Sequence, residues 1–132
     1  MHTEQILQTH PRGDVDTTHL TEVIESLLDC AQACTSCADA CLAEDMVADL
    51  RRCIRLNQDC ADVCLAGARI ASRLTDSDSE TLRSLLNACE VACRACADEC
   101  DQHAQMHEHC RICAEACRRC AEVCSQALQQ LS

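Results

Sequence analysis

Small and apolar residues recur at intervals of three and four along most of the chain, and this periodicity predicts amphipathic helices. The clearest stretch is CEVACRACADEC, residues 89–100, in which cysteines stand at intervals of four, three and four. Because an α-helix has about 3.6 residues per turn, this spacing places four thiols along one helix face. No segment of the sequence alternates between apolar and polar residues with a period of two, so we expect no strands.

Breaks in the periodic pattern predict four long helices, over residues 18–43, 45–73, 77–103 and 106–128. Polar residues 16–18 supply N-cap candidates for the first of them. Ser77 and Glu80 have the spacing of a capping box, which predicts that the third helix starts there. The fold class is therefore predicted to be all-α.

The N-terminal residues differ from the rest of the chain. Residues 1–16 are mostly polar and include Pro11 and Gly13, so we expect a flexible tail with one short helical turn near residues 4–8. The remaining residues, 17–132, are few enough for one hydrophobic core, and we expect them to form a single bundle domain.

The cysteine pattern occurs twice. A shift of 59 (30 to 89) carries the run CxxxCxxCxxxC at residues 30–41 onto residues 89–100, and a shift of 60 (53 to 113) carries the cysteines of residues 53–64 onto those of 113–124. The second shift also pairs Asn57 with Cys117. The sequence therefore predicts a duplicated helical hairpin, and two such hairpins form an antiparallel four-helix bundle with a cysteine-lined core.

The two ends of this bundle are predicted to differ. One end collects aliphatic residues of the inward register, namely Leu20, Val23, Leu27, Ala68, Ala71, Leu74, Leu82, Leu85, Leu86, Leu128 and Leu131. The opposite end collects Met46, His103, Met106, His107 and His109. By helical angle, Met106 lies centrally on the cysteine face, while His103 and His109 lie at its edge. His107 points inward only if the third helix continues through it, which the tight connection disfavours.

The composition makes this core unusual. Sixteen of the 132 residues are cysteine, and Phe, Tyr and Trp are absent. A single buried cysteine is usually a small core hydrophobe. Leu or Ile at sixteen inward positions would bury much more apolar area, so stability does not explain the choice of cysteine. The sulfur atoms indicate a site for soft metal ions.

The net charge limits the possible binding partners, and the N-terminal sequence indicates the cellular compartment. There are 22 acidic residues against 11 arginines and no lysine, giving a formal net charge of -11. This acidic balance argues against nucleic acid and anionic membranes as partners. No apolar run resembles a signal peptide or a membrane-spanning segment, and the chain starts with Met1. We therefore expect a cytoplasmic protein, whose thiols are held reduced.

The sequence is compatible with three classes of thiolate metal protein, which bind zinc or cadmium, iron–sulfur clusters, or Cu(I). A zinc- or cadmium-sequestering protein in the manner of metallothionein is one alternative, since facing helices can form tetrahedral sites. An iron–sulfur electron-transfer protein is less favoured, because the ferredoxin run would need a cysteine where Ala31 stands and a proline after Cys41.

A catalytic metal needs an open coordination position and a substrate pocket. A core filled with thiols offers neither, so we expect no enzyme.

Cu(I) fits the pattern best, because it accepts two or three thiolates and thiolates can bridge neighbouring ions. Sixteen buried thiolates would carry sixteen uncompensated negative charges, which a low-dielectric core does not tolerate. Near one Cu(I) per thiolate, the core becomes neutral. We therefore expect a capacity on the order of one ion per cysteine, with protons released on loading.

The two CxxxCxxCxxxC runs, the four cysteine-faced helices and the His/Met end resemble the bacterial copper storage proteins, more specifically their cytosolic branch. The resemblance covers roughly residues 17–131 and implies a bundle that binds many Cu(I) ions, homotetramers, and a copper chaperone as a possible partner. It also implies that copper enters at the His/Met end, past His103, His109, Met46 and Met106. Asn57 occupies a slot that the repeat predicts to be cysteine, and is either a polar substitute ligand or a lost site.

The resemblance implies that all sixteen cysteines are storage ligands. They are Cys30, Cys34, Cys37, Cys41, Cys53, Cys60, Cys64, Cys89, Cys93, Cys96, Cys100, Cys110, Cys113, Cys117, Cys120 and Cys124.

Overall fold

A computed structural model of the chain describes residues 1–11 and 17–131. Its elements are α1 (Thr3–Gln8), α2 (Thr18–Leu42), the 3-10 helix η1 (Val47–Leu50), α3 (Arg51–Ala71), α4 (Ser79–Asp101) and α5 (Glu108–Leu131). The described residues contain helices and no strands, as the periodicity predicts.

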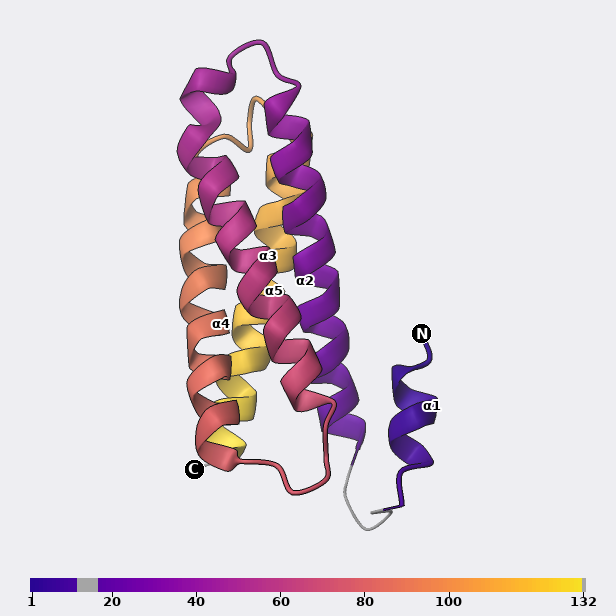
Figure 1. Ribbon diagram of the computed structural model, residues 1–132. Coiled ribbons are helices and arrows are strands. Elements are labelled where there is room, and N and C mark those ends of the chain that lie inside the picture. The colour runs from indigo at the N-terminus through magenta and orange to yellow at the C-terminus, as the bar shows by residue number, and fades with distance from the viewer. Residues whose placement is uncertain (12–16, 132) are drawn as a thin grey trace.

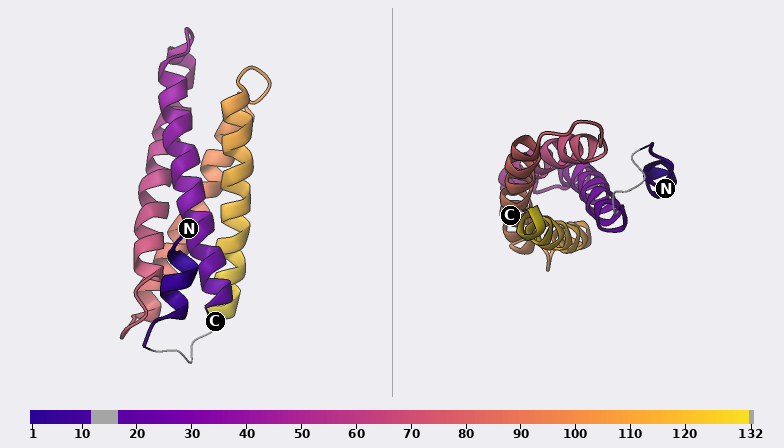
Figure 2. Two further views of the ribbon diagram at one scale, coloured as in Figure 1. Left: turned by 90° about the vertical axis from the view of Figure 1, so that its right-hand side faces the viewer. Right: turned by 90° about the horizontal axis from the view of Figure 1, so that it is seen from below.

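The four long helices form an antiparallel bundle (Figure 1). Seen along its axis, α2, α3, α4 and α5 stand at the corners of a square, and each packs against the next around the ring (Figure 2). The turns from α2 to η1 and from α4 to α5 lie at the upper end in Figure 1, and the α3–α4 turn lies at the lower end. The predicted pair of hairpins is confirmed.

Alanines allow the two helices of each hairpin to approach closely. Ala38 of α2 and Ala61 of α3 are buried in the first hairpin, and their repeat equivalents Ala97 and Ala121 are buried in the second. A methyl group fills little space between two backbones. The cysteines next to these alanines can therefore reach the bundle axis, although a thiol is a short side chain.

The lower end of the bundle has an aliphatic core, as the sequence predicts, although the predicted member Leu85 lies partly exposed beside Ile70, outside this cluster. Val23 and Leu27 of α2, Leu86 of α4 and Ala68 and Ala71 of α3 are all at most 3% exposed. Leu20, Leu74, Leu82, Leu128 and Leu131 pack against this cluster while partly exposed. We call this end the floor and the opposite end, where α2–η1 and α4–α5 turn, the mouth.

The first difference from the sequence prediction is the start of the second long helix. It was expected from Asp45, but α3 begins at Arg51 and is preceded by η1. A 3-10 helix turns by about 120° per residue, so the register set by Cys53 does not extend back through it. Leu50 is fully buried, whereas Met46 ends in the turn with 38% of its surface exposed.

The last helix also begins later than expected. Met106 was predicted to lie centrally on the cysteine face, but α5 begins at Glu108 and Met106 belongs to a turn. Its side chain is 64% exposed. The turn is closed by backbone hydrogen bonds to the carbonyl of His103 from the amides of Met106 and His107, and these direct Met106 away from the axis.

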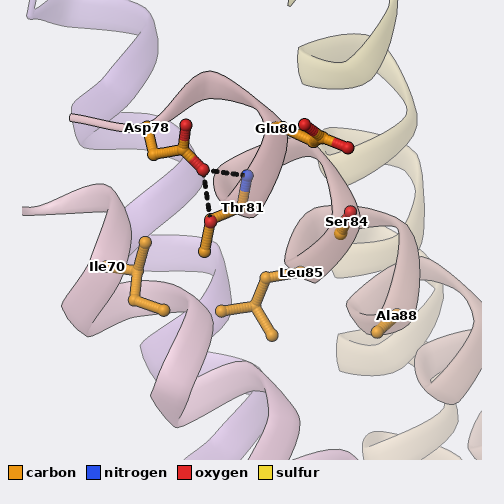
Figure 3. A pocket seen from close by; sticks show the side chains of 7 residues that line it. All are labelled: Ile70, Asp78, Glu80, Thr81, Ser84, Leu85 and Ala88. Atoms are coloured by element: carbon orange, nitrogen blue, oxygen red, sulfur yellow. Dashed lines mark hydrogen bonds between the residues drawn. The ribbon is translucent and has the colours of Figure 1, made fainter.

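A third difference concerns the start of α4, where the predicted capping box of Ser77 and Glu80 is wrong. The cap is Asp78, whose carboxylate accepts hydrogen bonds from the backbone amide and the hydroxyl of Thr81 (Figure 3). Asp78 has an extended backbone, as an N-cap requires, and its oxygen meets an amide that has no partner within the helix. The pKa of Asp78 is lowered by these bonds from Thr81.

The N-terminal residues include a short helix, α1, near the position expected for one helical turn. Leu7 of α1 is 4% exposed and belongs to the main hydrophobic cluster, and α1 packs against α2. The boundary proposed at residue 16 lies outside the described residues, so the division into tail and bundle remains a prediction. Within the described residues, no helix is both long enough and apolar enough to cross a membrane.

Replacing the true cap should weaken α4. We expect Asp78→Ala to lower the Tm of the metal-free protein by several degrees, because an amide at the helix start loses its acceptor. Ser77→Ala is the matched control and should leave the Tm unchanged. Thermal unfolding followed by circular dichroism measures both, and an equal loss in the two variants would contradict the assignment.

Candidate metal centre

All sixteen cysteines face the bundle axis, and none is more than 2% exposed. All are free thiols. They come from α2, α3, α4 and α5, reaching the last turn of α2 and α4 and the first turn of α3 and α5, and spacings of three, four or seven residues keep them on one face of each helix. The structure thus places every predicted cysteine in one continuous column of sulfur.

The sulfur atoms touch across the axis as well as along it. The Sγ of Cys30 on α2 lies 3.7 Å from Cys60 on α3, 3.7 Å from Cys93 on α4 and 3.8 Å from Cys117 on α5. Cys34 lies 3.5 Å from Cys117. One sulfur can therefore meet partners on all three other helices, an arrangement that suits ions held between helices.

The thiols converge in groups whose ligand atoms all lie within 4.8 Å of one another. Neighbouring groups share members: Cys30, Cys34 and Cys117 each belong to two groups of four. Groups made of cysteines alone include Cys30/Cys64/Cys93/Cys120, Cys30/Cys34/Cys60/Cys117, Cys34/Cys96/Cys113/Cys117 and Cys37/Cys53/Cys100. Because a shared thiolate can bridge two ions, this geometry suits a chain of linked ions better than separate closed sites.

Asn57 lies inside the column, fully buried. Its side-chain oxygen accepts hydrogen bonds from the thiols of Cys96 at 2.9 Å, Cys113 at 3.2 Å and Cys100 at 3.7 Å. Its amide nitrogen donates to Cys53 Sγ at 3.8 Å. The amide thus takes the place in the sulfur network that the repeat gives to a cysteine.

At the mouth, one histidine joins the thiols. His109 Nδ1 lies 3.4 Å from Cys37 Sγ and 3.7 Å from Cys110 Sγ, and these three residues with Cys41 form a further convergent group. His109 is partly buried, with 27% of its side chain exposed. His103 pairs instead with Glu99, with its Nε2 2.9 Å from the carboxylate. The structure therefore brings His109 to the thiols, whereas Met46 and Met106 lie exposed in the turns.

Two mouth residues were missed by the sequence analysis. His107 was judged unfavourably placed, yet it is 7% exposed. Glu44, which was not considered, lies 3.0 Å from His107 Nδ1 and 2.9 Å from His109 Nε2. Glu44 is one of many acidic residues, and no spacing in the sequence links it to histidines more than sixty positions away.

Burial raises the pKa of two thiols near the mouth. It raises the pKa of Cys41 to about 11, together with repulsion from the neighbouring Cys53, and it is also the main cause of a raised pKa at Cys110. A metal ion that binds there must therefore displace protons. The hydrogen bond from His109 lowers the pKa of Glu44, which stays a carboxylate.

At the floor end of the column, a glycine makes room for a thiol. A Cβ on Gly67 of α3 would lie 2.9 Å from Cys89 Sγ and 3.4 Å from Leu27 Cδ1. Cys89 donates a hydrogen bond to the carbonyl of Val63 at 3.4 Å, which directs its sulfur toward α3. Hydrogen bonding to Cys124 and burial raise the pKa of Cys89 to about 12. The glycine thus allows Cys89 to join the neighbouring sulfur atoms.

This architecture matches a known family. The family model described as Csp, copper storage protein, matches residues 16–129. The chain belongs to the copper storage protein family. The column of thiols is therefore the copper site of a storage protein, and the zinc, cadmium and iron–sulfur alternatives are not favoured.

Solved structures of family members agree closely with this one. The Streptomyces lividans copper storage protein Ccsp, loaded with 10 copper equivalents, is 53% identical, with a TM-score of 0.93 over 96% of this chain and 98% of that chain. A five-copper structure of a cytosolic copper storage protein from the same organism is 56% identical, with a TM-score of 0.83 over 84% and 92%. Cu(I)-bound BsCsp3 is 37% identical, with a TM-score of 0.74 over 83% and 97%.

We expect Gly67→Ala to lower copper capacity by about one ion without unfolding the protein. The new methyl would push Cys89 Sγ away from its neighbours, while alanine favours a helix over glycine by about 1 kcal/mol. Equilibrium dialysis and thermal unfolding measure the two effects.

The double variant Gly67→Ala/Cys89→Ser is the control for this mechanism. If the methyl acts through Cys89, the double variant should bind as much copper as Cys89→Ser alone. A further loss in the double variant would show that Gly67→Ala disturbs the core more widely.

Proposed function

We propose that this protein stores Cu(I) in the thiol column, with a capacity on the order of one ion per cysteine. The observation that carries the proposal is the sharing of Cys30, Cys34 and Cys117 between groups of converging thiols. Shared thiolates allow the number of monovalent ions to approach the number of sulfurs. All sixteen cysteines are then storage ligands.

We propose that copper enters at the mouth. The support is chemical: His109 presents a ring nitrogen to Cys37 and Cys110 while remaining partly exposed. His103 and the exposed thioethers of Met46 and Met106 are soft or borderline ligands at the same end, suited to a first, weak contact with an arriving ion. The aliphatic side chains of the floor offer no such ligand, although the imidazole of His19 lies beside Leu20 and Val23 there.

For Asn57 we propose a role within the copper site rather than a lost site, with its amide oxygen at most a weak ligand because Cu(I) prefers sulfur. Its carbonyl oxygen already accepts hydrogen bonds from three thiols, so it points at the place where those sulfurs would hold metal.

The remaining parts of the proposal concern the compartment, the oligomeric state and the partners of the protein. Storage of Cu(I) on reduced thiols suits the cytoplasm, and the Streptomyces relative is described as cytosolic. We propose a homo-oligomer, tetrameric by family resemblance, that receives copper from a chaperone and catalyses no reaction. Leu65, Val91 and Ile112 are exposed apolar residues on α3, α4 and α5 that would suit contacts between copies.

An anaerobic titration of the reduced protein with Cu(I), against a chromophoric chelator, tests the storage proposal. We expect saturation at well over ten ions per chain, near one per thiolate. Each ion should release about one proton, because the buried thiols are protonated beforehand, and binding should therefore weaken as the pH falls. Saturation near four ions per chain would indicate closed tetrahedral sites and contradict the proposal. A parallel Zn(II) titration is the control for metal preference.

A further inference from the structure

Glu44 connects the two hairpins at the mouth. It lies in the turn after α2, and a single oxygen, Oε2, lies 3.0 Å from His107 Nδ1 and 2.9 Å from His109 Nε2, both in the second hairpin. The two imidazole rings stack, with centroids 5.5 Å apart and planes inclined by 26°. One carboxylate therefore fixes the orientation of two rings.

This contact also fixes where the ring protons are. A carboxylate can only accept hydrogen bonds, so His109 Nε2 carries hydrogen, and the 3.0 Å ion-pair distance from the same oxygen favours hydrogen on His107 Nδ1. A neutral imidazole has one N–H, which leaves lone pairs on His109 Nδ1 and His107 Nε2. The two histidines are thus held in opposite tautomers by the same oxygen atom.

One of these two nitrogens faces the sulfur column, and the other is buried without a partner in the described part of the chain. His109 Nδ1 is the nitrogen that faces Cys37 and Cys110. His107 is 7% exposed, and its Nε2 is buried with no hydrogen-bond partner among the described residues. A buried nitrogen without a partner is costly in a folded protein, which points to a ligand that this atom receives.

We propose that Glu44 is a positioning residue of the mouth, which holds His109 and His107 in the tautomers that present His109 Nδ1 and His107 Nε2 to incoming Cu(I). The inference rests on the proposed copper storage function. Glu44 is not itself a ligand here, because its oxygen is engaged by both rings and a hard carboxylate is a poor partner for Cu(I). Metal-binding histidines commonly donate their second N–H to a carboxylate, and loss of that partner typically weakens metal binding 10- to 100-fold.

The neighbouring acid Asp45 provides a matched control. It is exposed, carries the same formal charge at the same end of the bundle, and follows Glu44 directly in sequence. Asp45→Asn removes one negative charge from the mouth without touching the contacts to His107 and His109. Glu44→Ala removes both the charge and the acceptor, whereas Glu44→Gln keeps a carbonyl oxygen that can still accept from a ring.

The first test uses metal-free protein labelled with ¹⁵N in histidine, because imidazole nitrogen shifts distinguish the two tautomers. We expect wild type and Asp45→Asn to show His109 protonated on Nε2 and His107 on Nδ1. Glu44→Ala should give mixtures of tautomers at both rings, with Glu44→Gln in between. Unchanged tautomers in Glu44→Ala would overturn the proposal.

The second test measures the affinity for the last equivalents of Cu(I) taken from a chelator, because these ions occupy the mouth. We expect them to bind about 10- to 100-fold more weakly in Glu44→Ala, with the earlier equivalents unchanged and Asp45→Asn like wild type. If Glu44→Ala lowers only the Tm and leaves uptake as in wild type, Glu44 is merely a structural link between turns and the proposal is wrong. Failure of the storage function would appear separately, as low capacity in wild type, because the tautomer measurement needs no copper.

Discussion

A thiol buried between four helices can bind a metal ion only after it loses its proton, and this exchange governs the whole structure. A low-dielectric core does not tolerate sixteen free thiolates. When a monovalent ion replaces each proton, the net charge of the core is the same before and after loading. The helices can therefore enclose the sulfur column completely, without countercharges beside it, and the acidic residues can stay on the outside.

The same constraint explains why the rest of the core consists of alanines and aliphatic side chains. Alanines such as Ala38 and Ala121 let the helices approach until short thiol side chains meet at the axis. Larger residues would separate the helices and leave the sulfur atoms out of contact. The aliphatic cluster around Leu27 and Leu86 is confined to the floor, where it packs the bundle by ordinary hydrophobic burial without competing for space in the column.

Most of the fold and the inner part of the metal site could be predicted from the sequence, because both follow from local periodicity. Cysteine spacings of three, four and seven residues fix the inward face of each long helix, and the repeat of residues 30–41 at 89–100 fixes the topology. The cap of α4 was misplaced by one residue, since Ser77 and Asp78 are both good caps and only the backbone decides between them.

The mouth could not be predicted in the same way, because it depends on turns and on contacts between hairpins. The 3-10 helix η1 breaks the register that would have brought Met46 inward, and the late start of α5 exposes Met106. The contact from Glu44 to His109 joins residues 65 positions apart. No periodic pattern in the sequence encodes such a contact.

The sharing of sulfur atoms between groups has a consequence for the movement of copper ions along the column. An ion that moves from the group containing Cys30 and Cys60 to the one containing Cys96 and Cys113 can keep its bond to Cys34 or Cys117 during the step. Migration then proceeds by ligand exchange, and no bare cuprous ion is ever released inside the bundle. If copper enters at the mouth, as proposed, the ions bound last lie nearest the mouth and would be the first to leave.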